Sequence, residues 1–258
     1  MKITKIEKKK RLYLLEIDDT EKLYVTEDTI VAFFLSKGMT IDQQTLEEIK
    51  QFAQLSYGKN LALYYISFKQ RTEKEVRDYL IQHDIDKRIC PQVIKTLKSE
   101  KWIDDRKYVQ SFIQQNQLTG DKGPHVLSQK LFQKGIDKDL VQQELRNSDF
   151  DDIIQKQAQK LLKGYHTKLN QRALKDKIVQ GLITKGFDFN DAKIACDNLD
   201  IQTNDDKEQE LLQKELDKYY RKLSRKYEGY DLKQRLLQSL VRKGFDYSEI
   251  QTNLREYF

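Results

Sequence analysis

A seven-residue signature, Leu-x-x-Lys-Gly-apolar-Asp, recurs along this chain and limits what it can fold into. It occurs in full at residues 131–137, 182–188 and 240–246, and in a variant form at residues 80–86, where Asp84 stands in place of glycine. The leucines are spaced 51, 51 and 58 residues apart. A repeat at this spacing predicts tandem copies of one small structural unit.

Each position of the signature has a physical role in a helical hairpin. An amphipathic helix ends at the lysine, and the glycine takes a left-handed backbone conformation that other residues reach only at an energetic cost. The apolar residue folds back onto the helix, and the aspartate starts the next helix by accepting a backbone N–H. The turn lysines Lys134, Lys185 and Lys243 are partly explained as cations at helix C-termini.

Apolar residues continue the repeat on both sides of the turn. They stand four positions before each leucine and five, ten and fourteen positions after it. The predicted core residues are Val76, Ile85, Cys90, Ile94, Leu127, Ile136, Val141, Leu145, Ile178, Phe187, Ala192, Cys196, Leu236, Phe245, Ile250 and Leu254. These helical spacings predict a hairpin with a buried seam. Both cysteines fall on core positions, which favours small buried hydrophobes over a reactive thiol.

A third helix is expected before each hairpin. From the second unit onward its start carries paired acids: Asp104 and Asp105, Asp151 and Asp152, and Asp205 and Asp206. Carboxylates at this position suit helix capping and the helix dipole, which is a simpler explanation than catalysis. In the first unit the corresponding helix covers residues 45–71, with an interruption at Gly58. Residues 72–75 (Thr-Glu-Lys-Glu) then predict a capping box that opens the first hairpin.

The first forty residues follow a different pattern. Residues 11–17 and 22–26 are rich in Leu, Tyr, Val and Ile and flank the turn sequence Asp-Asp-Thr-Glu, which predicts a β-hairpin. Residues 3–6 are a candidate third strand. A short apolar helix is expected over residues 27–35.

Together these patterns predict a mainly α-helical protein of tandem three-helix repeats in an elongated, curved array, with a small β-containing N-terminal cap. The predicted segments are 1–45 for the cap and 46–100, 101–148, 149–203 and 204–258 for the first to fourth repeats. Composition agrees, because 34% charged and 38% hydrophobic residues suit thin helical layers better than one thick globule.

The sequence lacks the motifs of common enzyme and cofactor sites. Neither a Gly-x-x-x-x-Gly-Lys-Ser/Thr nor a Gly-x-Gly-x-x-Gly motif occurs, and His83, His125 and His166 are scattered. We therefore expect no enzymatic activity, no cofactor and no metal. The N-terminus lacks a signal-peptide core and the apolar runs are too short to span a bilayer, so we expect a cytoplasmic protein without a membrane contact. We also expect a monomer.

Basic side chains form candidate binding surfaces. Residues 218–227 place five basic groups and three tyrosines on about three helical turns, and Lys156, Lys160 and Lys163 form a similar row. Residues 64–71 combine aromatic and basic side chains at the end of the first long helix. Such surfaces suit phosphates, stacked bases or an acidic protein face. Alternatively, the tyrosines pack between repeats and the charges only provide solubility, since a net charge of +6 permits an anionic partner without indicating one.

Three segments, in order, carry a family resemblance. Residues 71–80 (Arg-Thr-Glu-Lys-Glu-Val-Arg-Asp-Tyr-Leu), residues 102–112 with their Asp-Asp-Arg run, and residues 122–136, which join Lys-Gly-Pro to Leu-x-x-Lys-Gly-Ile, resemble motifs of the RecX family, the bacterial regulators of the RecA recombinase. These motifs cover about residues 70–146. The N-terminal cap and the later repeats are similar to those of longer family members.

The resemblance implies a non-enzymatic protein that binds the RecA filament and suppresses its ATP hydrolysis and strand exchange, within DNA recombination, DNA repair and the SOS response. Some members also bind DNA. Family members usually carry basic residues after the Gly-Pro, whereas this chain has His-Val-Leu at 125–127, so this segment is a weaker phosphate-binding candidate.

The candidate residues for binding a partner or DNA are Arg71, Arg77, Lys98, Lys101, Arg106, Lys156, Lys160, Lys163, Lys218, Tyr219, Arg221, Lys222, Arg225 and Lys226. Two other functions stay open. One is a general helical-repeat protein that binds single- or double-stranded nucleic acid, with only indirect effects on RecA. The other is an enzyme with an unfamiliar site, which would need a pocket of convergent polar groups.

Overall fold

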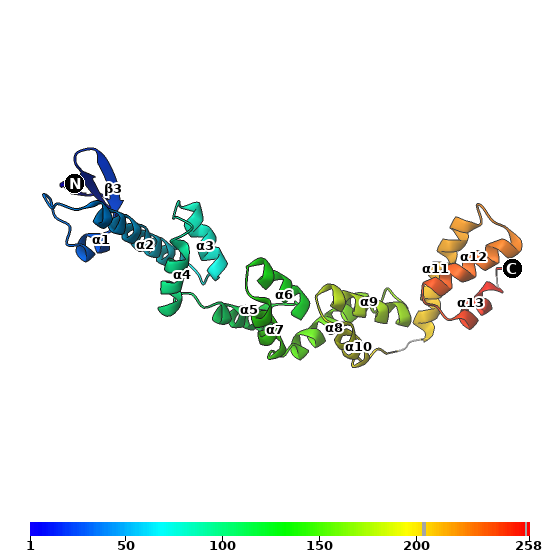
Figure 1. Cartoon of the computed structure of the whole chain (residues 1–258). Coiled ribbons are helices and arrows are strands. Elements are labelled where there is room, and N and C mark those ends of the chain that lie inside the picture. Colours follow the sequence, from blue (N-terminus) through cyan, green and yellow to red (C-terminus); the bar gives the residue numbers. More distant parts are fainter. Residues whose placement is uncertain (203–204, 256) are drawn as a thin grey trace. The chain divides into compact units, whose positions relative to one another are not determined.

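The computed structural model describes residues 1–202, 205–255 and 257–258 of the chain. These residues form a three-stranded sheet followed by thirteen α-helices (Figure 1). The mainly α-helical fold with a small β-containing cap is therefore confirmed. The chain divides into two compact units, residues 1–112 with 130–144 and residues 113–129 with 145–258, which we describe separately. The curvature of the array stays a prediction.

The N-terminal sheet contains the predicted hairpin and the third strand. Strands β1 (Ile3–Lys8), β2 (Tyr13–Ile17) and β3 (Glu21–Val25) are antiparallel and adjacent in chain order. Asp18 and Asp19 form the β2–β3 turn with φ angles of 49° and 56°. Aspartate tolerates this left-handed conformation better than most residues, so the Asp-Asp pair is suited to the turn.

The register of the sheet collects apolar side chains on one face. Ile3 lies opposite Ile17 and Tyr13 opposite Val25, with one irregularity between Ile3 and Lys5. Ile3, Ile17 and Val25 are almost completely buried in a core shared with the helix that follows. The sheet is thus a cap that covers one end of the first long helix.

The short helix after the sheet ends earlier than predicted. Helix α1 covers Glu27–Ala32 rather than 27–35. The chain leaves the helix at Phe34, which has a φ of 48°, and the N–H of Leu35 bonds back to the carbonyl of Ile30 at 2.9 Å. The side chain of Leu35 is thereby buried in the N-terminal core, and this burial explains the early stop.

The first repeat contains helices α2 (Gln43–Ser67), α3 (Glu73–Gln82) and α4 (Cys90–Ser99). The predicted interruption at Gly58 is wrong, because α2 is continuous through this residue. A Cβ atom at Gly58 would lie 3.1 Å from a methyl group of Val93 in α4. The glycine therefore allows two helices to pack closely, which sequence alone does not distinguish from a helix break.

The other three repeats have the predicted three helices each, among the residues that the structure describes. Their helices are α5 (Asp105–Thr119), α6 (Pro124–Gln133), α7 (Lys138–Arg146), α8 (Asp151–Tyr165), α9 (Gln171–Thr184), α10 (Phe189–Asp197), α11 (Asp205–Leu223), α12 (Gly229–Arg242) and α13 (Tyr247–Leu254).

The turn of each hairpin has the predicted chemistry. Gly135, Gly186 and Gly244 have φ angles of 79°, 95° and 92°, and Asp84 has one of 61° in the first copy. The apolar residue that follows donates its N–H to the carbonyl of the signature leucine, at 3.1–3.3 Å in the four copies. This is the bond of a Schellman cap. In the second, third and fourth copies the aspartate side chain accepts backbone N–H groups at the start of the next helix. In the first copy this prediction is wrong, because α4 begins only at Cys90, with Ile89 at the cap position.

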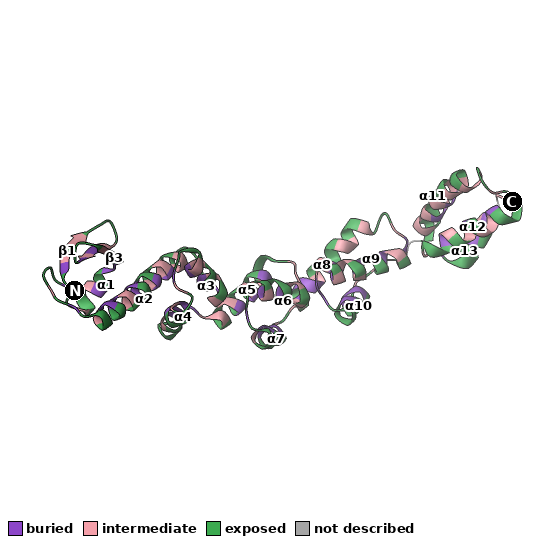
Figure 2. Ribbon diagram, turned by 45° about the horizontal axis from the view of Figure 1, so that its top comes forward, coloured by how far each residue is buried: buried purple, intermediate pink, exposed green. Residues whose placement is uncertain are grey.

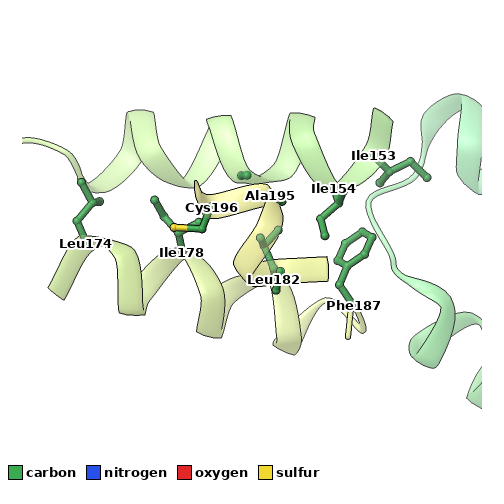
Figure 3. Close-up of a cluster of buried hydrophobic side chains, with 10 residues drawn as sticks. Ile153, Ile154, Leu174, Ile178, Leu182, Phe187, Ala195 and Cys196 are labelled. Atoms are coloured by element: carbon green, nitrogen blue, oxygen red, sulfur yellow. The ribbon is translucent and has the colours of Figure 1, made fainter. Parts of the chain in front are cut away.

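All sixteen predicted core residues are buried. Figure 2 colours the ribbon by burial, and buried residues (purple) occur on helices of every repeat. In the third repeat, Leu174, Ile178 and Leu182 form a row along α9 (Figure 3). They pack with Cys196 of α10 in one cluster, and Cys90 is likewise 1% exposed. Both cysteines are buried, which confirms the prediction of core cysteines. Burial raises the pKa of both thiols.

Consecutive repeats are joined where the hairpin of one meets the turn of the next. In the first unit, the Thr72 hydroxyl at the start of α3 donates to the carbonyl of Lys134 at 2.9 Å. In the second unit, the Gly123 N–H donates to the carbonyl of Lys185 at 2.8 Å. The third junction has the Asn170 amide donating to the carbonyl of Lys243 at 3.0 Å. The N-terminus of α3 thus meets the C-terminal turn of α6. In the same way, the N-terminus of α6 meets the turn after α9, and the N-terminus of α9 meets the turn after α12.

This junction gives the signature glycines a second role. A Cβ atom at Gly186 would lie 2.6 Å from the backbone nitrogen of Val126, and one at Gly135 would lie 2.2 Å from the side chain of Lys74. Real Cβ atoms do not approach so closely. The first copy of the signature has no preceding hairpin to meet, which explains why Asp84 is tolerated there.

The paired acids play three different roles. Asp104 caps α5 by accepting the Lys107 N–H at 3.0 Å, as predicted. Its neighbour Asp105 instead accepts the Glu73 N–H of α3 at 2.9 Å. Capping by residues 151–152 is wrong, because Phe150 occupies the cap position of α8 and both acids lie in the first turn. Asp205 and Asp206 also lie in a first turn, and the two preceding residues are outside the described part.

Candidate partner-binding surface

Several candidate cations of the first two repeats are paired with carboxylates. Arg77 and Lys98 both pair with Glu73, and Lys98 Nζ lies 2.9 Å from its Oε2 atom. Arg106 lies 2.7 Å from Glu144, whose side chain is largely buried. Lys98 and Arg106 thereby join helices of the first unit, whereas the pair of Arg77 with Glu73 lies within α3. Their role in binding a partner stays a prediction.

Two other candidates lie in structural positions. The guanidinium carbon of Arg71 is 3.9 Å from the ring centroid of Tyr65, a cation–π contact. Lys101 has a φ of 62° and follows the end of α4, where the Trp102 N–H bonds to the carbonyl of Leu97 at 2.9 Å. Lys101 therefore performs the helix-stop role that glycine has elsewhere. Its side chain remains exposed.

The row on α8 consists of exposed cations. Lys156, Lys160 and Lys163 are spaced by four and three residues, so they lie on one side of the helix. Within the described residues none of them forms an ion pair. Residues 153–175 contain six basic residues and no carboxylate. Because neighbouring like charges repel, this face is suited to an anionic partner.

The stripe at residues 218–227 is divided by the end of a helix. Helix α11 ends at Leu223, so the expectation of one helix through residue 227 is wrong. Lys218 pairs with Glu215 at 3.0 Å. The other four cations, Arg221, Lys222, Arg225 and Lys226, are exposed and have no ion pair among the described residues. Two of them lie in the last turn of α11, where the helix dipole favours positive charge.

The tyrosines of this stripe belong to the core of the fourth repeat. Tyr219, Tyr220 and Tyr227 are partly buried and pack against the cluster of leucines that joins α11 to α12. The ring of Tyr220 also lies 5.2 Å from that of Tyr257. Packing within one repeat therefore accounts for these rings, and Tyr219 stays a binding candidate only by prediction.

A basic groove was missed by sequence reasoning. It has a volume of about 590 Å³ and lies in the second unit, between α9 and the turn after α12. Arg172, Lys177, Arg242 and Lys243 line it, together with the carboxylate of Asp176. Arg172 and Lys177 come from α9 and lie 65–71 residues before Arg242 and Lys243 in the sequence. The junction between Asn170 and Lys243 brings the two pairs together. No motif in the sequence indicates this groove.

No group of three or more His, Cys, Asp or Glu side chains that could hold a metal ion is found in residues 1–202, 205–255 and 257–258. Over the same residues, no helix has both the length and the apolar character needed to cross a membrane.

The repeats, their head-to-tail junctions and the exposed cations define a tandem three-helix repeat protein with exposed basic side chains. Comparison with known proteins gives the family. The chain matches the first three-helix domain of RecX at residues 59–97, the second at 104–145 and the third at 205–252. The chain belongs to the RecX family. The predicted third repeat lies between the second and third matched domains.

Relatives and solved structures agree with this assignment. The chain is 62% identical to "Regulatory protein RecX" of Streptococcus sanguinis and 61% identical to that of Streptococcus agalactiae, over the full length of both chains in each case. A crystal structure of regulatory protein RecX has a TM-score of 0.64 and 29% identity, covering 76% of this chain and 99% of that one. RecX from Lactobacillus salivarius has a TM-score of 0.55 and 32% identity, covering 58% and 98%.

Proposed function

We propose that this protein binds the filament of the RecA recombinase and lowers its ATP hydrolysis and strand exchange. The observation that carries the proposal is membership of the RecX family along the whole chain, with regulatory proteins as full-length relatives. The protein acts in the cytoplasm as a monomer, without a cofactor and without catalysing a reaction itself.

The distribution of unpaired cations supports binding of the partner by the third and fourth repeats more than by the first. Cations of the first repeat, such as Arg77 and Lys98, are already paired with Glu73 at the surface. Lys156, Lys160 and Lys163 on α8, and the four cations at and beyond the end of α11, are free for carboxylates or phosphates of a DNA-bound filament. Charges of this kind steer association and make it dependent on salt.

RecA-dependent ATP hydrolysis on single-stranded DNA tests the proposal. Titration with this protein should lower the rate, and the quadruple variant R221Q/K222Q/R225Q/K226Q should need on the order of tenfold more protein for half-inhibition. The matched control K5Q/K50Q/K59Q/R88Q removes four cations that are already ion-paired and are not binding candidates, and it should inhibit almost as well as the wild type. A rate that is unchanged at excess wild-type protein would refute the proposed function.

A general nucleic-acid-binding protein is the second candidate. The 23 residues from 153 to 175 favour it, because they contain six cations and no carboxylate. This function predicts tight DNA binding that weakens steeply with salt, and little affinity for RecA without DNA. Pull-down of DNA-free RecA separates the two: capture favours the direct regulator, whereas DNA binding without capture favours the second candidate.

A further inference from the structure

Two aromatic rings lie on the surface near the C-terminal end of α2. Tyr64 and Phe68 are one helical turn apart, with ring centroids at 4.9 Å and planes at 89°. The Tyr64 residue is 49% exposed and Phe68 is 68% exposed. An exposed phenylalanine ring gains little from burial in the folded protein, and its open face is available for stacking.

The β1–β2 loop brings a guanidinium group to this pair. The N-terminal cap contacts α2 at two places: Glu21 pairs with Lys50 at 2.8 Å, and Arg11 of the β1–β2 loop reaches Tyr64. The guanidinium carbon of Arg11 lies 5.4 Å from the Tyr64 ring centroid. The fold therefore joins a basic loop and an aromatic helix end that are more than fifty residues apart in sequence.

Both segments at this place lack carboxylates. Residues 8–15 contain four cations and no acid, and residues 51–72 contain three cations and no acid. Lys10 and Lys69 directly adjoin Arg11 and Phe68. Both are exposed and form no ion pair within the part of the chain that the structure describes. Lys8, Lys9 and Lys59 in these segments are ion-paired with Glu27, Glu7 and Glu100. Unpaired positive charge at this place therefore comes from Arg11 and from the sequence neighbours Lys10 and Lys69.

We infer that this cluster of Lys10, Arg11, Tyr64, Phe68 and Lys69 binds single-stranded nucleic acid. An unpaired base stacks on the ring of Phe68, and the cations on both sides contact the adjoining phosphates. Aromatic stacking combined with a basic groove is how proteins bind single strands without sequence preference. A duplex hides the faces of its bases, so the cluster favours single strands over double strands.

This site shares no residue with the cations of α8 and α11 that the proposed function assigns to RecA binding. It lies wholly in the first unit and uses none of the cations of α8 or α11. The inference does not rest on the proposed function, because an oligonucleotide can bind the free protein. RecA is therefore left out of the test, so that failure here and failure of RecA inhibition are distinguishable.

The test uses the full-length protein and a fluorescein-labelled oligothymidylate. Fluorescence anisotropy should show binding that F68A weakens by about 5- to 150-fold, the range expected for loss of one stacked base. The matched control F34A removes another exposed phenylalanine of the first unit, at 84% exposure, and should leave the affinity unchanged. Because Phe68 is exposed, both variants should give the circular dichroism spectrum of the wild type.

A second measurement reports on this site even if cations elsewhere contribute to the affinity. Trp102 is the only tryptophan of the chain, so the variant W102F/F68W carries a single indole at the site. Adding oligothymidylate should quench this indole, and a duplex of the same length should quench it much less. Absence of quenching, equal quenching by the duplex, or equal affinities of F68A and wild type would each overturn the inference.

Discussion

The hydroxyl of Thr72 donates a hydrogen bond to the backbone carbonyl of Lys134, which is 62 residues further along the chain, at 2.9 Å. The same oxygen accepts the N–H of Glu75 and so caps α3. Asn170 has this double role in the second unit, where it caps α9 and donates to Lys243. The residue that starts one helix is therefore also the residue that holds the next repeat.

Replacing Thr72 by valine should lower the free energy of unfolding by about 1–3 kcal/mol. Valine keeps the shape of the side chain but removes both the helix cap and the bond to the next repeat, and it leaves buried polar groups without partners. Urea denaturation followed by circular dichroism measures the change. T184V removes an exposed hydroxyl that bonds only to its own helix, and it should change the stability by less than about 0.5 kcal/mol.

Two glycine-to-alanine substitutions should act in opposite directions. G186A should destabilise by at least about 2 kcal/mol, because φ is 95° and the added methyl group would meet the backbone of Val126. G164A should stabilise by about 0.5–1 kcal/mol, because this glycine lies in α8 with open space around a Cβ atom. Thermal unfolding of both variants tests this, and equal effects would contradict the double role of Gly186.

Restoring glycine to the first copy of the signature should stabilise the protein. Asp84 has a φ of 61°, a conformation that favours glycine, and no preceding hairpin packs on it. D84G should therefore raise the free energy of unfolding by up to about 1 kcal/mol, measured by urea denaturation. A loss of stability would show that the aspartate side chain has a stabilising role that its turn geometry does not reveal.

Local rules explain why so much of the fold could be predicted. The spacing of Leu182, Phe187, Ala192 and Cys196 reflects one buried seam, and every residue of that set is buried. The Lys-Gly turn is equally local, because its hydrogen bonds connect residues that are only three to five apart. A tandem repeat adds independent copies of each pattern, so chance matches are reduced.

Features that depend on distant residues could not be predicted. Position 58 needs a glycine because Val93 of another helix packs closely on it. Phe150 takes the cap position that the neighbouring aspartates were expected to hold. The candidate site shows the same limit. Whether a surface cation is paired depends on acids from other helices. Lys98, for example, pairs with Glu73, and Arg106 pairs with Glu144. Spacing along one helix does not contain that information.

Asp105 also depends on a distant residue, because it joins the second repeat to the first. Its contribution to folding stability should therefore change with pH. Asp105 lies at the start of α5, and its carboxylate accepts the Glu73 N–H of α3. Burial is the main cause that raises the pKa of this carboxyl above its ordinary value of 3.8. The neighbouring charges of Glu73 and Asp104 raise the pKa further, and the charge of Lys98 lowers it.

The pH dependence of folding stability should follow from this shift. Between the ordinary and the raised pKa the folded state binds more protons than the unfolded state, so the contribution of Asp105 to stability decreases as the pH rises through that window. D105N retains an oxygen that can accept the Glu73 N–H but carries no charge. Its stability relative to wild type should therefore increase across the window and stay constant above it, as measured by urea denaturation at a series of pH values.

Asp42 provides the matched control for this prediction. Its carboxylate caps α2, and hydrogen bonds from Thr45 lower its pKa. A lowered pKa gives the opposite sign, because stability is then present above the ordinary pKa and is lost as the pH falls through the folded value. D42N should therefore lose stability relative to wild type at neutral pH and approach it in acid. A difference between wild type and D105N that is constant with pH, or that follows the trend of D42N, would contradict the assignment of a raised pKa to Asp105.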